Sequence, residues 1–298
     1  MRNVNLIKNV ILKKCAAAVV LCAAASAAYA DPTNLVQNGT FASVSGSGPT
    51  NGLDSVFNRD GSPSYTYSLT DWTYYSSRSR NNGFSAVLTP GAATTTGFAA
   101  DGMTFNLWDS TSPNPPGGGP GTIPTNPPSG PNNIWMSDGD SENQSTLGQT
   151  ISGLVPGAMY NVTFNYAAAQ LRGYNNNQYN GATNDAWEVN LGGTIGGTAP
   201  NDNEVQGGTT LVTPELFIAS HDFSGWYSAS LTFTATAAME NLFFTAFSTS
   251  QGLPPQALLD DVSLTAVPEP STLAIMGIGL AGVGFAAYRR RARIRALA

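Results

Sequence analysis

Acidic residues are the side chains of this sequence with the clearest capacity for chemistry. Asp138, Asp140 and Glu142 alternate with Gly139 and Ser141, which is the way calcium loops present oxygen ligands, although the rest of an EF-hand spacing is missing. The segment therefore predicts either a calcium site or a solvated turn.

Asp260 is the second acidic candidate, because it lies within an apolar segment. Strand alternation would place it on the face that Leu258, Val262 and Leu264 share. A carboxylate that points toward a core needs a cation or several hydrogen-bond donors. The sequence leaves open whether loop amides or a structural Ca²⁺ fill that need, and calcium is the one cofactor that it suggests.

Other catalytic groups are scarce. His221 is the only histidine, and the neighbouring Asp222 could not orient it from within a strand, because adjacent strand residues point to opposite faces. A glycosidase needs two carboxylates about 5 to 10 Å apart, and 19 acidic residues leave such a pair open without singling one out. The sequence assigns no catalytic residue and predicts a protein that is not an enzyme, with a polysaccharide-acting hydrolase as the alternative.

A polar segment over residues 172–185 is the candidate ligand site. It contains two tyrosines separated only by amide side chains: Tyr174, Asn175, Asn176, Asn177, Gln178 and Tyr179. Aromatic faces can stack on the apolar C–H faces of sugar rings while amides bind the hydroxyl groups. The segment predicts a sugar-binding loop, with a connection that binds no ligand as the alternative.

Strands are the elements that must position these residues. Apolar side chains alternate with polar ones from Tyr160 to Tyr166, which is the period of a half-buried strand. Further strands are predicted at 34–37, 69–75, 84–88, 103–108, 147–151, 186–191, 227–235, 242–247 and 258–264. Because many short strands alternate with Gly- and Asn-rich loops, the sequence predicts an all-β protein with a single β-sandwich or jelly roll over residues 31–266. Eight prolines and five glycines in residues 110–131 predict an extended loop within it.

The charges are segregated along the chain. All three lysines lie within residues 1–14, and five of the ten arginines lie within residues 289–295. Residues 31–266 contain four arginines and 18 acidic residues, a net charge of −14, which excludes nucleic acid as a partner.

Residues 1–30 combine basic positions, an apolar run and a small-residue cleavage site, and are predicted to be a helical secretory signal peptide. Both cysteines lie within it, so no thiol or disulfide is expected after cleavage.

The C-terminal segment, residues 267–298, has three parts. Pro268, Glu269 and Pro270 precede an apolar stretch over residues 272–288, and an arginine cluster follows. The stretch predicts a transmembrane helix of about 25 Å, slightly short of the bilayer core, with its basic end in the cytoplasm.

These three parts resemble the sorting signal of the PEP-CTERM protein family, some members of which are described by an ice-binding protein C-terminal domain. The resemblance implies a Gram-negative bacterial protein that is exported and anchored in the inner membrane. It also implies processing near the Pro-Glu-Pro motif by exosortase, with delivery to the cell envelope or the extracellular matrix.

The body resembles galactose-binding-like jelly rolls, including carbohydrate-binding modules. The likeness lies in three segments: residues 34–41, residues 149–157, and Leu259-Asp260-Asp261-Val262-Ser263-Leu264. In several such modules an acidic residue after the opening Phe holds calcium together with an Asp of the last strand, whereas this chain has Ala42 there. The sequence thus predicts a matrix or envelope protein that binds exopolysaccharide, with a hydrolase and a purely structural matrix component as alternatives.

Overall fold

The computed structural model describes residues 33–45, 68–75, 85–88, 98–100, 103–108, 130, 133–140, 144–172, 181–196, 204–249, 255–268, 279 and 282. Residues Asn34–Ala266 form one compact unit, and every described strand belongs to it. The predicted signal helix lies outside the described residues, as does the predicted membrane helix apart from Gly279 and Gly282. Within the described residues, no helix is long and apolar enough to cross a membrane.

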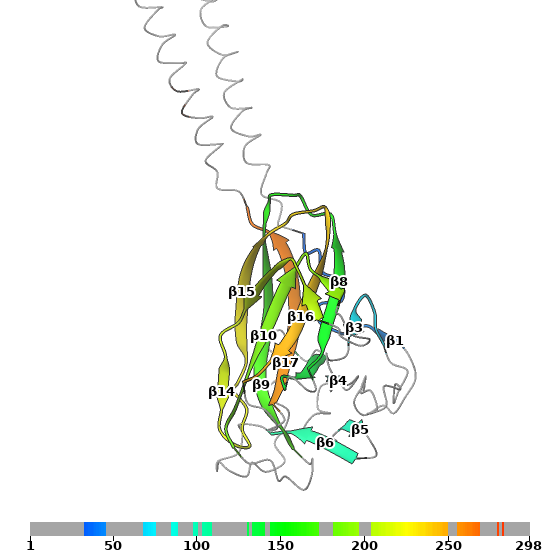
Figure 1. Cartoon of the computed structure of the whole chain (residues 1–298), viewed down its shortest axis with the longest axis vertical. Coiled ribbons are helices and arrows are strands. Elements are labelled where there is room, and N and C mark those ends of the chain that lie inside the picture. The colour runs from blue at the N-terminus through cyan, green and yellow to red at the C-terminus, as the bar shows by residue number, and fades with distance from the viewer. Residues whose placement is uncertain are drawn as a thin grey trace, which may run out of the picture. The chain divides into compact units, whose positions relative to one another are not determined.

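Two antiparallel sheets make up the body (Figure 1). The six-stranded sheet has the order β13-β10-β16-β8-β3, with β14 also paired to β10, and the seven-stranded sheet has the order β4-β7-β17-β9-β6-β5, with β15 also paired to β9. The first sheet comprises β3 (Thr73–Tyr75), β8 (Thr146–Ser152), β10 (Thr183–Leu191), β13 (Thr209–Val212), β14 (Leu216–Ile218) and β16 (Met239–Phe247). The second comprises β4 (Ser85–Leu88), β5 (Phe98–Ala100), β6 (Met103–Leu107), β7 (Ile134–Asp138), β9 (Met159–Arg172), β15 (Tyr227–Thr234) and β17 (Pro255–Ala266).

Two further strand pairs are small: β1 (Val44–Ser45) with β2 (Ser68–Leu69), and β11 (Thr194–Gly196) with β12 (Glu204–Gln206). The prediction of an all-β sandwich is confirmed in the described residues. The alternating segment Tyr160–Tyr166 lies within β9, and β15 and β16 lie close to their predicted ranges. Residues 34–37 form no strand, and β7 was not predicted.

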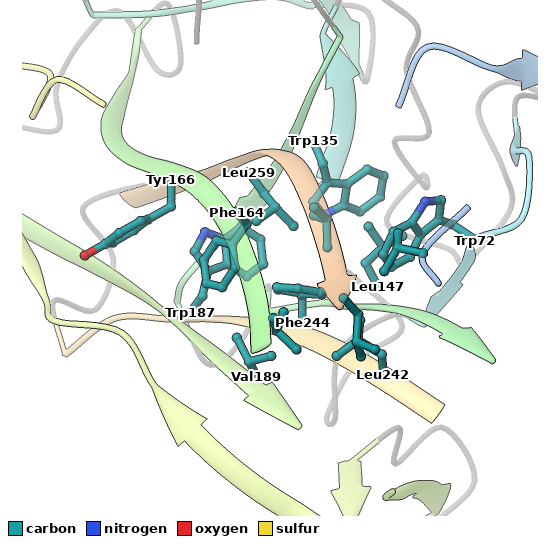
Figure 2. Packing of buried hydrophobic residues seen from close by; sticks show 14 of the residues in the cluster. Trp72, Trp135, Leu147, Phe164, Tyr166, Trp187, Val189, Leu242, Phe244 and Leu259 are labelled. Atoms are coloured by element: carbon teal, nitrogen blue, oxygen red, sulfur yellow. The ribbon is translucent and has the colours of Figure 1, made fainter. Parts of the chain in front are cut away.

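Aromatic side chains fill the space between the sheets (Figure 2). Phe244 of β16 lies at the centre, with its ring 5.2 Å from Phe164 of the opposite sheet and 6.3 Å from both Trp187 and Trp72. The Trp187 indole N–H donates to the backbone oxygen of Leu258 in β17 over 3.1 Å, so it also links the two sheets by a hydrogen bond. Trp187 is fully buried, as its alternation with Val189 and Leu191 predicts.

A β-bulge in β17 changes the predicted face of Asp260. The pairing of β17 with β9 shifts its register between Asp260 and Ser263, and Asp261 has a φ of 56°. Val262 therefore packs in the main core cluster, whereas Leu258 packs in a second cluster on the other side of the sheet. The prediction that Leu258 and Val262 share one face with Leu264 and Asp260 is wrong, because the extra residue reverses the alternation.

The first and last described segments of the body lie side by side. The Leu35 N–H donates to the Leu264 oxygen, and the Leu264 N–H donates to Asn34 Oδ1, each over 2.9 Å. Nearby, the Val262 N–H donates to the Gly39 oxygen over 2.9 Å. A Cβ atom on Gly39 would lie 2.0 Å from the Val262 oxygen, so this close approach requires glycine.

Gly39→Ala should therefore destabilise the protein by about 2 to 4 kcal/mol, because the new methyl group would collide with backbone. Gly196→Ala is the matched control, since the nearest atom to its new Cβ would be a Gln206 side-chain oxygen at 3.5 Å. Urea denaturation of both variants measures the difference. Equal stabilities would show that residues 38–41 can move away from β17 at little cost.

Candidate functional site

Strand ends gather the candidate site at one end of the sandwich. Gln256, at the start of β17, lies opposite Asp138, at the end of β7, and Pro255 lies opposite Gln170, near the end of β9. The connection from β9 to β10 leaves from this same end. The predicted ligand residues Tyr174, Asn175, Asn176, Asn177, Gln178 and Tyr179 belong to that connection, and they lie outside the described residues.

Two buried carboxyl groups meet at this end. Asp138 is 5% exposed and Asp185 is 1% exposed. The Asp185 carboxyl packs against Gly139, where its Oδ1 would be 2.6 Å from a Cβ atom added to that glycine. Asp138 Oδ1 accepts a hydrogen bond from the Asp140 N–H over 2.8 Å. Among the described residues, neither carboxyl oxygen of Asp185 has a hydrogen-bond partner.

The surroundings favour the protonated form of both groups. The pKa of Asp138 is raised to about 8, chiefly by burial. The hydrogen bond from the Asp140 N–H and the Gln256 side chain act to lower this pKa, whereas the nearby charge of Asp140 acts to raise it. Burial also raises the pKa of Asp185 well above its ordinary value, and the charge of Asp138 adds to this effect. At neutral pH the pair therefore holds protons that the unfolded chain would release.

Two neutral polar side chains add to this polar region. Gln256 is fully buried beside Asp138, yet neither its amide nitrogen nor its oxygen makes a hydrogen bond of normal geometry. Thr183 is 2% exposed, and its hydroxyl lacks a partner in the part of the chain that the structure describes. It shares a strand face with Asp185, two residues further along β10. The region combines acids with oxygen atoms that remain able to bind a proton donor or a cation.

The predicted calcium ligands are only partly brought together. Asp138 and Asp140 are both buried, so they do not form a solvated turn, and Glu142 lies outside the described residues. Asp260 is fully buried opposite Asn165 of β9, and Ala42 is exposed and offers no side-chain oxygen. Within the described residues, no group of three or more His, Cys, Asp and Glu side chains is arranged to hold a metal ion. Structural calcium stays a prediction.

A hollow of about 400 Å³ lies elsewhere, beside β3 and β8. It is lined by Gln37, Asp71, Trp72, Thr73, Gln149 and Thr150. The Gln149 amide donates to the backbone oxygens of Gln37 and Asp71 over 2.9 and 3.0 Å, and its oxygen accepts from the Gln37 N–H over 2.8 Å. The polar groups of this hollow are largely used within the protein, and it contains a single acidic residue.

His221 has a packing role. It lies in a turn with a φ of 63°, and its ring stacks on Trp108 with centroids 4.4 Å apart. The backbone N–H of His221 donates to Gln170 Oε1 over 2.6 Å. His221 is half-buried.

Asp185 and Gln256 are site residues that sequence reasoning missed. The polar segment 172–185 was predicted to be a loop, but β9 extends through Arg172 and β10 begins at Thr183. The pattern that could have placed Asp185 is the alternation of Trp187, Val189 and Leu191, because Asp185 lies two residues before Trp187 in the same series. All four residues are buried.

Comparison with known protein families identifies a PEP-CTERM protein-sorting motif at residues 266–291. The chain thus has the exosortase sorting signal that the sequence predicts, and the match begins at the last residue of β17. No curated protein matches the chain.

Solved structures with a similar fold include cyclases, carbohydrate-binding modules and a glycoside hydrolase. A Stig cyclase, Fisc from Fischerella sp. TAU, is 15% identical with a TM-score of 0.41, over 80% of this chain and 100% of that chain. TmCBM61 in complex with beta-1,4-galactotriose is 10% identical with a TM-score of 0.33, over 79% and 99%. The arabinose-bound α-L-arabinofuranosidase MgGH51 is 14% identical with a TM-score of 0.38, over 80% and 27%.

The buried acids predict that stability depends on pH. With EDTA present, the free energy of unfolding should fall as pH rises from about 5 to 7. Asp138 alone should contribute up to about 1.4 kcal/mol per pH unit, and its contribution should level off above pH 8. The free energy of unfolding falls because, between the pKa of Asp138 in the unfolded chain and its pKa in the folded chain, the folded chain binds more protons.

Asp138→Asn should make this dependence shallower, and Asp261→Asn, at an exposed position, is the matched control. Urea denaturation at several pH values measures both. A free energy that rises over this range would contradict the burial of uncharged acids. Restoration of stability at pH 8 by CaCl₂ would favour the predicted calcium site.

Proposed function

We propose that this chain is an exported protein of the bacterial cell envelope or extracellular matrix whose β-sandwich binds polysaccharide. The observation that carries the proposal is the sorting motif at residues 266–291, which directly follows the last strand of a compact all-β body. A signal for export and exosortase processing at the end of such a body favours a role outside the inner membrane. The two partners are exosortase during processing and an exopolysaccharide afterwards.

The proposed sugar site is the connection between β9 and β10, with Tyr174 and Tyr179 as stacking residues. Its support is the position of the connection: the strands on either side are long and buried, so they hold it on a rigid framework. Amide side chains between the two tyrosines supply donors and acceptors for sugar hydroxyl groups.

The burial of the two acids at the candidate site favours binding without catalysis over hydrolysis there. Asp138 and Asp185 are nearly inaccessible to solvent, and the hollow beside β8 has Asp71 as its one acidic residue. A hydrolase would need two carboxylates facing a sugar across an open cleft. Release of reducing sugars from a bound polysaccharide would establish the hydrolase instead.

The sorting motif predicts removal of the C-terminal segment. We expect the protein recovered outside the cell to lack residues after the Pro268-Glu269-Pro270 motif, because the apolar stretch over 272–288 would otherwise keep it in the membrane. Intact-mass measurement of the released protein decides the question. A released chain that retains Arg289–Arg295 would contradict processing at this motif.

The proposed sugar site predicts a separation of binding from stability. Replacement of both Tyr174 and Tyr179 by Ala should abolish retention on the polysaccharide that binds the unchanged protein, and it should leave the melting temperature nearly the same. Phe217→Ala is the control, since it removes a ring that is 76% exposed on β14. Affinity electrophoresis and thermal melting measure the two effects.

Each contrary result has a specific meaning. Unchanged retention of the double variant would place the sugar site elsewhere, and early unfolding would make the two tyrosines part of the core. If Phe217→Ala abolishes retention and the double variant does not, the sugar binds along β14.

A further inference from the structure

One margin of the sandwich ends in a strand that has a partner on one side only. β15 pairs with β9 along its whole length, from Tyr227 opposite Tyr166 to Thr234 opposite Met159, and it pairs with no other described strand. Figure 1 shows β15 along this margin. In an antiparallel pair only part of the backbone groups bond to the partner, so the remaining N–H and C=O groups of β15 face outward.

This edge is longer than β13 (Thr209–Val212), the exposed strand of four residues at one end of the six-stranded sheet. β4, at one end of the seven-stranded sheet, is buried along its four residues, and β3, at one end of the six-stranded sheet, has three residues. β15 has eight residues, and every one of them except Phe233 is exposed or half-exposed. It is therefore long enough and accessible enough to pair with another strand.

The usual protections of a sheet edge are missing from β15. Its sequence, Tyr-Ser-Ala-Ser-Leu-Thr-Phe-Thr, contains no charged residue and no proline, and its register with β9 has no bulge. The uncharged stretch is longer than the strand, since no acidic or basic residue occurs between Asp222 and Glu240.

The lack of charge on β15 makes this edge a place where a second copy of the same acidic chain can approach. Residues 31–266 contain 18 acidic residues against four arginines, so two copies repel each other over most of their surfaces. The β15 edge lets two copies approach without bringing charges together. An antiparallel strand pair also has the two-fold symmetry that a homodimer needs.

We infer that two copies of this chain associate through antiparallel pairing of their β15 strands, which joins the two seven-stranded sheets into one continuous sheet. The outward backbone groups of β15 then find partners in the identical strand of the second copy. The side chains of Ser228 and Thr232 already have partners in β9. Their hydroxyls donate to Asn165 Oδ1 over 2.9 Å and to Asn161 Oδ1 over 2.7 Å. The association does not depend on the proposed binding of polysaccharide.

The test compares two variants of the full chain, purified in detergent, that add the same negative charge at different places. Ser230→Glu adds it to an exposed position in the middle of β15, and Thr150→Glu adds it to an exposed position of β8 in the other sheet. Sedimentation equilibrium should show a dimer for the unchanged chain. Ser230→Glu should raise its dissociation constant by about tenfold or more through like-charge repulsion across the new pair, and Thr150→Glu should leave it unchanged.

A second measurement guards against a Ser230→Glu chain that does not fold. Ser230→Cys, in a chain with Cys15→Ser and Cys22→Ser, should form a covalent dimer with a short bismaleimide, whereas Thr150→Cys in the same background should not. A monomeric unchanged chain would overturn the inference. So would a dimer that responds equally to both Glu variants, because association through the apolar stretch 272–288 would be indifferent to the position of the charge.

Discussion

Contact between the aromatic rings of two sheets is the interaction on which the rest of this structure depends. Phe244 of one sheet meets Phe164 of the other edge to face, and the Trp187 indole reaches across to hydrogen-bond the Leu258 backbone. Aromatic pairs of this kind bury large apolar areas and also fix the relative orientation of the elements that bear them. With the sheets held this way, the core between them is made of apolar side chains, and the buried acids Asp138 and Asp185 lie near strand ends.

The aromatic core supplies the stability that the burial of Asp138 and Asp185 at one end of the sandwich requires. Burial raises the pKa values of both Asp138 and Asp185, so it favours their uncharged forms in the folded chain. Burial of the aromatic residues offsets the free energy that this arrangement costs. The contribution of these two groups to stability is therefore larger at low pH, which is the reverse of the contribution of a carboxylate that forms an ion pair.

Period-two alternation predicted the strands with mixed apolar and polar faces, and failed where a strand is polar or interrupted. The alternation from Tyr160 to Tyr166 was enough to predict β9, but β7 follows a segment rich in Pro and Gly and is buried on both faces, so it has no alternation to detect. Asp185 was assigned to a loop because Asn and Asp favour turns, and tertiary burial overrode that preference. The face of Asp260 could not be predicted, since a single inserted residue at the bulge reverses it.

The position of the last strand has a consequence for the order of events during export. β17, residues Pro255–Ala266, lies between β7 and β9 in the middle of its sheet, so the earlier strands have no central partner until the C-terminal part of the chain arrives. Any nascent or truncated chain that stops before residue 255 lacks the strand that joins β7 to β9. Because the sorting motif begins where β17 ends, the strand that completes the sheet and the sorting motif are synthesised one directly after the other. A chain that stops before residue 255 therefore lacks both the strand that completes the sheet and the sorting motif.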